Sequence, residues 1–96
     1  MPYFIEDQTT NAYNSRCLVR QTQLMQATMD FVQYFMNLGD DKPTADQKVS
    51  DVSTEVAIYL YAYVLGNKTP LLDMINASVL PFMDQTAKDF LIQQLS

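Results

Sequence analysis

A helical repeat that runs without a break from Tyr13 to Leu38 constrains this chain more than any other feature of its sequence. At 100° per residue, most apolar side chains fall on one half of the helical wheel, and mainly polar side chains, with Tyr34, fall on the other half. No alternation of period two competes with this pattern over the same length. We therefore expect a long amphipathic helix. Its buried half is expected to contain Cys17, Leu18, Leu24, Met25, Thr28, Met29, Phe31, Val32, Phe35, Met36 and Leu38.

Glycines mark the ends of two predicted helices. Gly39 follows the first helical repeat and Gly66 follows a second one, and each stands where a left-handed residue commonly ends a helix. Between them, Thr44 precedes a glutamine by three residues, which is the spacing of a capping box at the start of a helix. We expect the first helix over about 13–38 and the second over about 45–65.

Prolines shape the last third of the chain. Thr69 and Pro70 have the order of an N-cap followed by proline at the first helical position. Pro81 disfavours helical geometry at the residue before it and marks a break or a kink. We expect helices over about 70–79 and 82–95, and the pattern leaves open whether they are two helices or halves of one kinked helix. The earlier of the two is expected to bury Leu71, Leu72, Ile75 and Val79.

Taken together, these patterns predict one all-α domain over residues 1–96. A chain of this length buries enough apolar surface for one modest core. We expect a bundle of about four helices, preceded by a short extended arm over 1–11. Tyr3, Phe4 and Ile5 favour extended structure, so the arm is expected to lie over the bundle or to reach a neighbouring molecule.

The residues that carry most enzyme chemistry are scarce. The chain has no histidine and one cysteine, Cys17. Without histidine the chain lacks the commonest general base, the histidine-dependent nucleophile pairs and most kinds of zinc site. Cys17 lies on the apolar half of the first helix, so we expect a buried and unreactive thiol. The sequence predicts no enzyme activity, no metal and no cofactor.

A cluster of carboxylates between the first two helices has the length of a calcium-binding loop. Asp40, Asp41, Asp46 and Asp51 fall within twelve residues. The ligand pattern does not fit, because Ala45 stands where a calcium loop needs glycine and Asp51 stands where it needs glutamate. We interpret these carboxylates as part of a solvated loop and of the helix start that follows it.

The charge balance argues against binding to nucleic acid. Eleven acidic and six basic side chains give a net charge of −5, whereas nucleic-acid backbones are bound by clusters of lysine and arginine. The segment 70–79, which would be the recognition helix of a helix-turn-helix, contains Asp73 and no basic residue. Direct nucleic-acid binding is therefore not expected, and a nucleic-acid-associated regulator is the least favoured function.

Features of the sequence also favour a cytoplasmic location. The first residues lack a basic segment followed by an apolar one, so no cleaved secretory signal is expected. The longest apolar-rich run, from Val56 to Leu65, is about half as long as a bilayer-spanning helix. A single cysteine fits a reducing compartment. We expect no membrane association.

The end of the second helix carries apolar residues all round, which suggests a binding surface. Such a helix is either central to its bundle or covered by another chain. Both interpretations stay open, because the third and fourth helices could enclose the second completely. If they do not, tyrosine and large apolar side chains here are typical of interface hot spots. The candidate partner-binding residues are Ile58, Tyr61, Ala62 and Leu65, joined by Phe82 and Ile92 from the end of the chain.

The polar half of the first helix is a second candidate surface. It is rich in glutamine and asparagine, and Asp30 is its one charge between Gln21 and Asn37. Ordinary exposed helix faces alternate charges. A neutral amide face loses less free energy on desolvation than a charged one, so a partner can cover it more easily. The candidate residues here are Gln23, Gln26, Gln33 and Tyr34.

These features favour a non-enzymatic protein-protein interaction module. Small, acidic helical proteins without motifs are common among accessory proteins of phages and mobile elements, so the leading hypothesis is an inhibitor or adaptor of that type, for example an inhibitor of host defence. The alternative is a self-assembling structural subunit. In that case the same surface would face further copies of the chain, and Tyr3, Phe4 and Ile5 would form an exchanged arm.

Overall fold

The protein is all-α. The computed structural model describes the backbone of residues 8–96 and the side chains of residues 17–96. It contains helices α1 (Gln8–Asn37), α2 (Lys42–Val64), α3 (Thr69–Asn76) and α4 (Gln85–Leu95). Each helix packs on two others, in the cyclic order α1, α2, α3, α4 and back to α1. The prediction of an all-α bundle of about four helices is confirmed.

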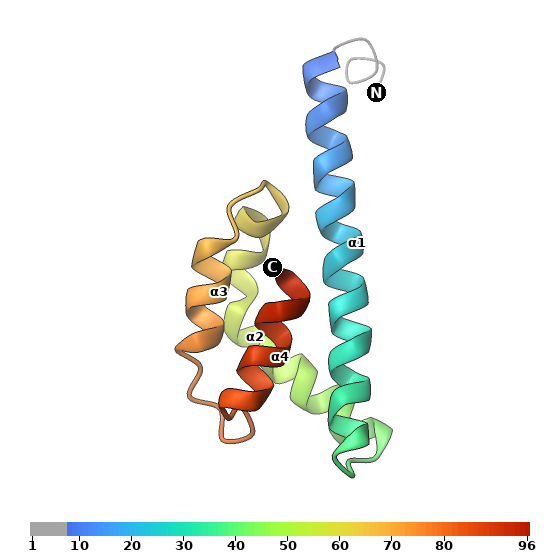
Figure 1. Cartoon of the computed structure of the whole chain (residues 1–96), viewed down its shortest axis with the longest axis vertical. Coiled ribbons are helices and arrows are strands. Elements are labelled where there is room, and N and C mark those ends of the chain that lie inside the picture. The colour runs from blue at the N-terminus through green and yellow to red at the C-terminus, as the bar shows by residue number, and fades with distance from the viewer. Residues whose placement is uncertain (1–7) are drawn as a thin grey trace.

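The long first helix begins earlier than its sequence pattern indicates. It starts at Gln8, so residues 8–11 are helical and do not belong to an extended arm. The rest of the predicted arm, with Tyr3, Phe4 and Ile5, lies outside the described residues. In Figure 1 the N-terminal turns of α1 run beyond the other three helices, and α2 and α4 pack against the rest of α1.

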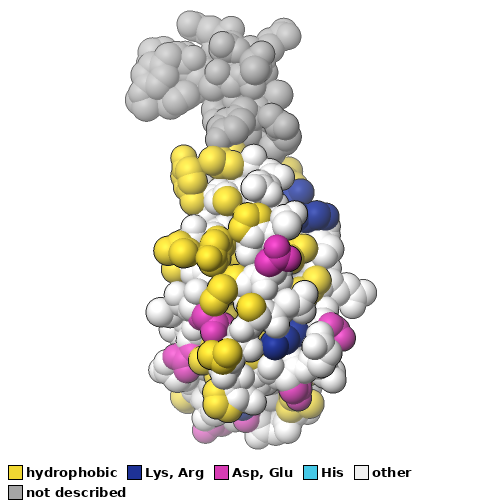
Figure 2. All heavy atoms as spheres, turned by 90° about the vertical axis from the view of Figure 1, so that its left-hand side faces the viewer, with side chains coloured by type: hydrophobic (Ala, Val, Ile, Leu, Met, Phe, Trp, Pro, Cys, Tyr) yellow, Lys and Arg dark blue, Asp and Glu magenta, His cyan; other side chains and the backbone are white. Residues whose placement is uncertain are grey.

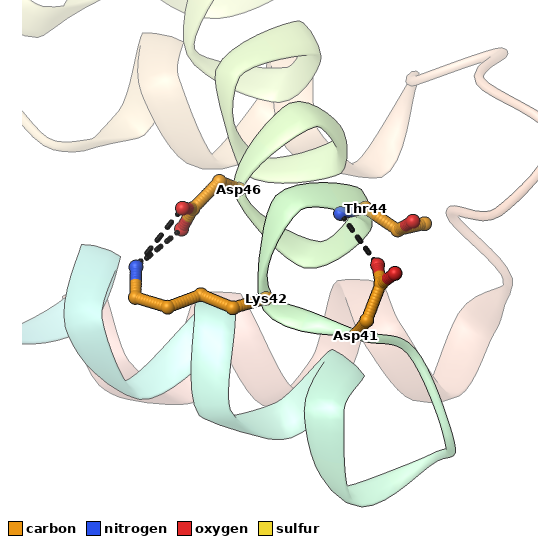
Figure 3. Close-up of polar contacts among 4 residues, drawn as sticks. All are labelled: Asp41, Lys42, Thr44 and Asp46. Carbon is orange, nitrogen blue, oxygen red and sulfur yellow. Dashed lines mark hydrogen bonds and ion pairs between the residues drawn. The ribbon is translucent and has the colours of Figure 1, made fainter.

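The start of α2 differs from the prediction because a different residue caps the helix. Asp41, not Thr44, is the N-cap: its carboxylate accepts a hydrogen bond of 3.0 Å from the backbone N–H of Thr44 (Figure 3). Pro43 stands in the first turn, where a proline costs no hydrogen bond. Lys42 reaches Asp46 one turn later, with 2.9 Å between Nζ and Oδ2. The helix therefore starts three residues before the predicted position.

The last two helices are separate, and both are shorter than predicted. α3 ends at Asn76, so the predicted segment 77–79 is not helical. Thr69 is the first residue of α3 and not its cap; Lys68 holds the cap position without a side-chain hydrogen bond. α4 begins after Asp84, whose carboxylate accepts a hydrogen bond of 2.9 Å from the backbone N–H of Ala87.

Both glycines end helices as predicted. Gly39 and Gly66 have φ angles of 114° and 103°, in the left-handed region that favours glycine. After α2, the N–H of Asn67 donates to the carbonyl of Ala62 and the N–H of Gly66 donates to that of Tyr63. The same pair of bonds follows α1. This pattern satisfies carbonyls that the helix end leaves free.

The core contains an aromatic cluster and a layer of aliphatic side chains. Phe31 and Phe35 lie 4.7 Å apart between ring centroids, and the ring of Phe90 from α4 lies 6.1 Å from Phe31. Tyr63 is fully buried, and its hydroxyl donates a hydrogen bond of 2.9 Å to the carbonyl of Leu95 near the chain end. The largest fully buried side chains are Tyr63, Phe31, Phe35, Leu71 and Ile75.

The predicted buried half of the first helix is only partly correct. Because α2 and α4 both pack on one side of α1, they cover a narrow arc around Phe31 and not half the helix. The remaining apolar side chains stay in solvent. Those with more than 60 % exposure that were expected inside the core are Leu18, Met25, Met29 and Leu38. Val79 was also expected inside; it is 87 % exposed in the loop after α3.

Candidate functional site

The C-terminal turns of α2 expose large apolar side chains, which we call the α2 patch: Ile58, Tyr61, Ala62 and Leu65. Ile58 is 79 % exposed and Tyr61 is 73 % exposed, while Leu65 is less exposed and Ala62 is half-buried. The buried residues of the same helix, including Val56 and Tyr63, lie on its other side. Of the two interpretations that the sequence left open, α3 and α4 therefore do not enclose this side of α2.

A shallow groove lies between α2 and α3. It has a volume of about 410 Å³ and is lined by Tyr59, Thr69, Pro70, Asp73, Met74 and Ala77. Tyr59 stands one helical turn before Ala62, so the groove adjoins the α2 patch. Figure 2 views this side of the molecule: hydrophobic side chains gather along one edge of its upper half, and lysine and arginine lie toward the other edge. The two features together offer an apolar surface beside a hollow.

Phe82 and Ile92, predicted to join this surface, lie elsewhere. Both are half-buried and pack against the core. The ring of Phe82 lies 5.5 Å from that of Phe35, and the ammonium of Lys48 lies 5.7 Å from its centroid. The spacing of these residues along the chain predicted that they face outward. It gives no information about how the loop over 77–84 folds back on the bundle.

The polar half of α1 divides into two parts. Gln23 and Tyr34 contact α4: the amide of Gln23 donates a hydrogen bond of 3.1 Å to the carbonyl of Gln94, and Tyr34 stacks on Phe90 at 4.7 Å. Burial, with a smaller effect from the Asp84 carboxylate, raises the pKa of Tyr34. Both residues thus stabilise the fold. Gln26 and Gln33 are exposed.

A row of mostly apolar side chains on α1 is partly exposed, although all its apolar members were expected in the buried half of the helix. This α1 stripe consists of Leu18, Thr22, Met25, Met29, Val32 and Met36. Leu18, Met25 and Met29 are 63–67 % exposed, and Val32 and Met36 are half-buried. Its spacing of three and four residues is also that of Leu24, Ala27, Phe31 and Tyr34 on the inner side of α1, so spacing alone does not separate the two rows.

A second groove runs beside the C-terminal part of the α1 stripe. Its volume is about 380 Å³, and it is lined by Thr28, Met29, Val32, Gln33, Met36, Lys42 and Asp46. The charged pair at its rim, Lys42 and Asp46, comes from the first turn of α2. The groove therefore extends the stripe from α1 to the start of α2.

An apolar cleft of about 110 Å³ lies between α1 and α2. Its lining includes Leu24, Thr28, Ser53 and Leu60, with core residues of all four helices beneath them. Sites for cofactors and drug-sized ligands usually occupy about 300–1,000 Å³. This cleft is thus a gap in the packing, too small for an organic cofactor.

The acidic residues after α1 are engaged within the chain. Asp40 forms an ion pair of 2.6 Å with Lys48, and Asp46 pairs with Lys42. The hydrogen bond from Thr44 lowers the pKa of Asp41. Within residues 17–96, no three side chains among histidine, cysteine, aspartate and glutamate are grouped closely enough to hold a metal ion. Cys17 is half-buried, not fully buried as expected.

Comparison of the chain with protein-family models, with curated proteins and with solved structures finds no match. None of the helices in the described part of the chain has the length and the apolar character needed to cross a bilayer. The candidate site is therefore supported by the surface chemistry of α1, α2 and α3.

Proposed function

We propose that this protein is a non-enzymatic interaction module that binds a protein partner through the α2 patch. The observation that carries the proposal is the exposure of Ile58 and Tyr61, at 79 % and 73 %. Burying an isoleucine or leucine side chain contributes about 1.5–3 kcal/mol, which is the scale of an interface hot spot. Two neighbouring side chains of this kind on a rigid helix can anchor a complex.

The surroundings of the patch indicate the chemistry of the partner. The groove beside it is lined by Tyr59, Met74 and the carboxylate of Asp73. A partner with a projecting apolar side chain and a neighbouring lysine or arginine would fill the groove and pair with Asp73. The net charge of −5 attracts a basic partner at long range and so raises the association rate.

The biological role proposed for this module is that of a small inhibitor or adaptor of phage or mobile-element type, such as an inhibitor of host defence. Its small size, its acidic charge and its lack of histidine support that role. We also propose the cytoplasm as its location, because the single Cys17 leaves no internal disulfide to form.

Paired variants test the proposed surface. Tagged wild-type protein, Ile58→Asp and Tyr61→Asp are used to capture partners from cells of the native host, with mass-spectrometric identification. The matched control is Val79→Asp, which places the same charge on an apolar residue that is 87 % exposed outside the patch. We expect one protein to be recovered with wild type and control and lost with both patch variants, while the melting temperatures stay similar. Equal recovery by the patch variants would reject this surface.

A further inference from the structure

The α1 stripe has the repeat of a helix that packs against another helix. Its residues are separated by four, three, four, three and four positions from Leu18 to Met36. The mean period of 3.5 residues keeps one row of side chains facing a second helix, as in coiled coils. Any apolar helix face can bind a globular surface, but a strict 3.5-residue repeat specifically fits a partner helix.

Within the described residues, the chain leaves Leu18, Met25 and Met29 of this row exposed and covers Val32 and Met36 only in part. α2 and α4 contact the opposite side of α1, where Ala27, Phe31 and Phe35 are at most 3 % exposed. The helix has 30 residues and is therefore about 45 Å long, and its N-terminal turns run beyond the rest of the bundle (Figure 1). A second helix can approach the stripe along most of its length.

The residues that flank the α1 stripe indicate which kind of molecule packs against it. In coiled coils, charged side chains at these positions choose the partner and its orientation. Here they are all uncharged: Val19, Gln21, Gln26, Thr28, Gln33 and Phe35. An identical face can therefore lie against this one without like-charge repulsion, although the whole chain has a charge of −5. A charged partner helix would find no opposite charges to pair with.

We infer that a second copy of this chain packs antiparallel along the α1 stripe. In that arrangement Leu18 of one copy meets Met36 of the other, Thr22 meets Val32, and Met25 meets Met29. Every residue of the row thus finds a partner from the same row. The antiparallel direction also places the projecting N-terminal part of each stripe beside the 380 Å³ groove at the C-terminal part of the other.

The size of the contact sets the expected affinity. The row is about 27 Å long and a helix is about 10–12 Å wide, so the footprint is about 300 Å² on each copy. Stable interfaces commonly bury about 800 Å² on each partner. The dimer is therefore expected to dissociate in the micromolar range and to be a separate property from partner binding by the α2 patch.

Sedimentation velocity over a concentration series tests the dimer. We expect wild type to pass from monomer to dimer with rising concentration, and Met25→Glu/Met29→Glu to need at least about tenfold more protein to do so. Ile58→Asp, on the α2 patch, should dimerise like wild type and so separates this inference from the proposed function. A wild type that remains monomeric at millimolar concentration, or that forms larger assemblies, would overturn the inference.

Disulfide trapping tests the antiparallel direction. In a Cys17→Ser background, the double variant Thr22→Cys/Val32→Cys should form a covalent dimer on mild oxidation. The single variant Thr22→Cys should not, because position 22 faces position 32 of the other copy. Intramolecular bridging is excluded, because ten residues of helix separate the two sites by about 15 Å. Efficient dimerisation of the single variant would show a parallel pair and contradict the proposal.

Discussion

The two faces of α1 have similar apolar content and opposite surroundings. The inner face presents Phe31, Phe35 and Tyr34 to α2 and α4, and these rings pack in tilted and edge-on pairs at centroid distances of 4.7–5.8 Å. The outer face presents Met25 and Met29 to solvent. Aromatic rings bury much area in fixed geometry, whereas flexible methionine suits surfaces that adapt to a partner. Side-chain type, more than apolar content, distinguishes the face that folds the chain from the face available for recognition.

The largest expected effect is on the inner face. Phe31→Ala should lower the free energy of unfolding by about 3–5 kcal/mol, because it leaves a cavity among rings that cannot collapse into it. Phe31 is 1 % exposed and contacts Tyr34, Phe35 and Phe90. Urea unfolding followed by circular dichroism measures the change. A loss below about 1 kcal/mol would mean that the aromatic cluster is not the core.

Two glutamines of α1 mark the boundary between its inner and outer faces, because one contacts α4 and the other is exposed. Gln23→Ala removes the hydrogen bond to the carbonyl of Gln94 and should cost about 1 kcal/mol of unfolding free energy. Gln26→Ala removes an exposed bond to Asp30 on the same helix and should cost less than about 0.5 kcal/mol. Chemical denaturation of both variants measures the two losses of unfolding free energy. Equal effects would show that α4 does not dock on α1 through Gln23.

A smaller effect on stability is expected at Asp41, in the turn that brings α2 onto the inner face of α1. The hydrogen bond from Thr44 lowers the pKa of Asp41 below its ordinary value of 3.8, so the folded state binds a proton less readily there than the unfolded state. This stabilisation is present above pH 3.8 and is lost as the pH falls through the lower, folded-state value.

Asp41→Asn keeps a good helix cap but removes the titrating group. Below pH 3.8, the free energy of unfolding should therefore fall more steeply with pH for wild type than for the variant. At higher pH, the free energies of the two proteins should change with pH in the same way. Urea unfolding at a series of pH values measures this difference. Identical pH dependence of both proteins would contradict the role of Asp41 as the cap of α2.

The sequence was a good guide to the helices because their signals are local. The glycines at 39 and 66 require only the geometry of the turn itself, and both predictions hold. Caps were harder to predict: Asp41 and Thr44 are both good capping residues three positions apart, and the choice between them depends on where the loop leaves α1. The end of α3 was misplaced because residues 77–79 favour a helix locally but belong to a loop that returns to the core.

The candidate surfaces were less predictable, because exposure depends on neighbouring helices. The pattern on α2 separated Ile58 and Tyr61 from the apolar opposite face of that helix, but it left open whether other helices cover them; both are exposed. On α1 the apolar residues spread over half the wheel, and only the positions of α2 and α4 determine which of them are covered. Met25 and Met29 were thus assigned to the core, because the buried and the exposed rows of α1 share the same spacing.

The account depends most on the outer faces of α1 and α2 being unnecessary for folding. Met25→Gln/Met29→Gln tests this directly, because glutamine keeps helix propensity and removes the apolar groups. The free energy of unfolding is measured by urea titration at a protein concentration low enough to keep the chain monomeric. The account predicts a change within about 0.5 kcal/mol. A loss of about 2 kcal/mol or more, as for methionines in a core, would show that the stripe is buried within the single chain.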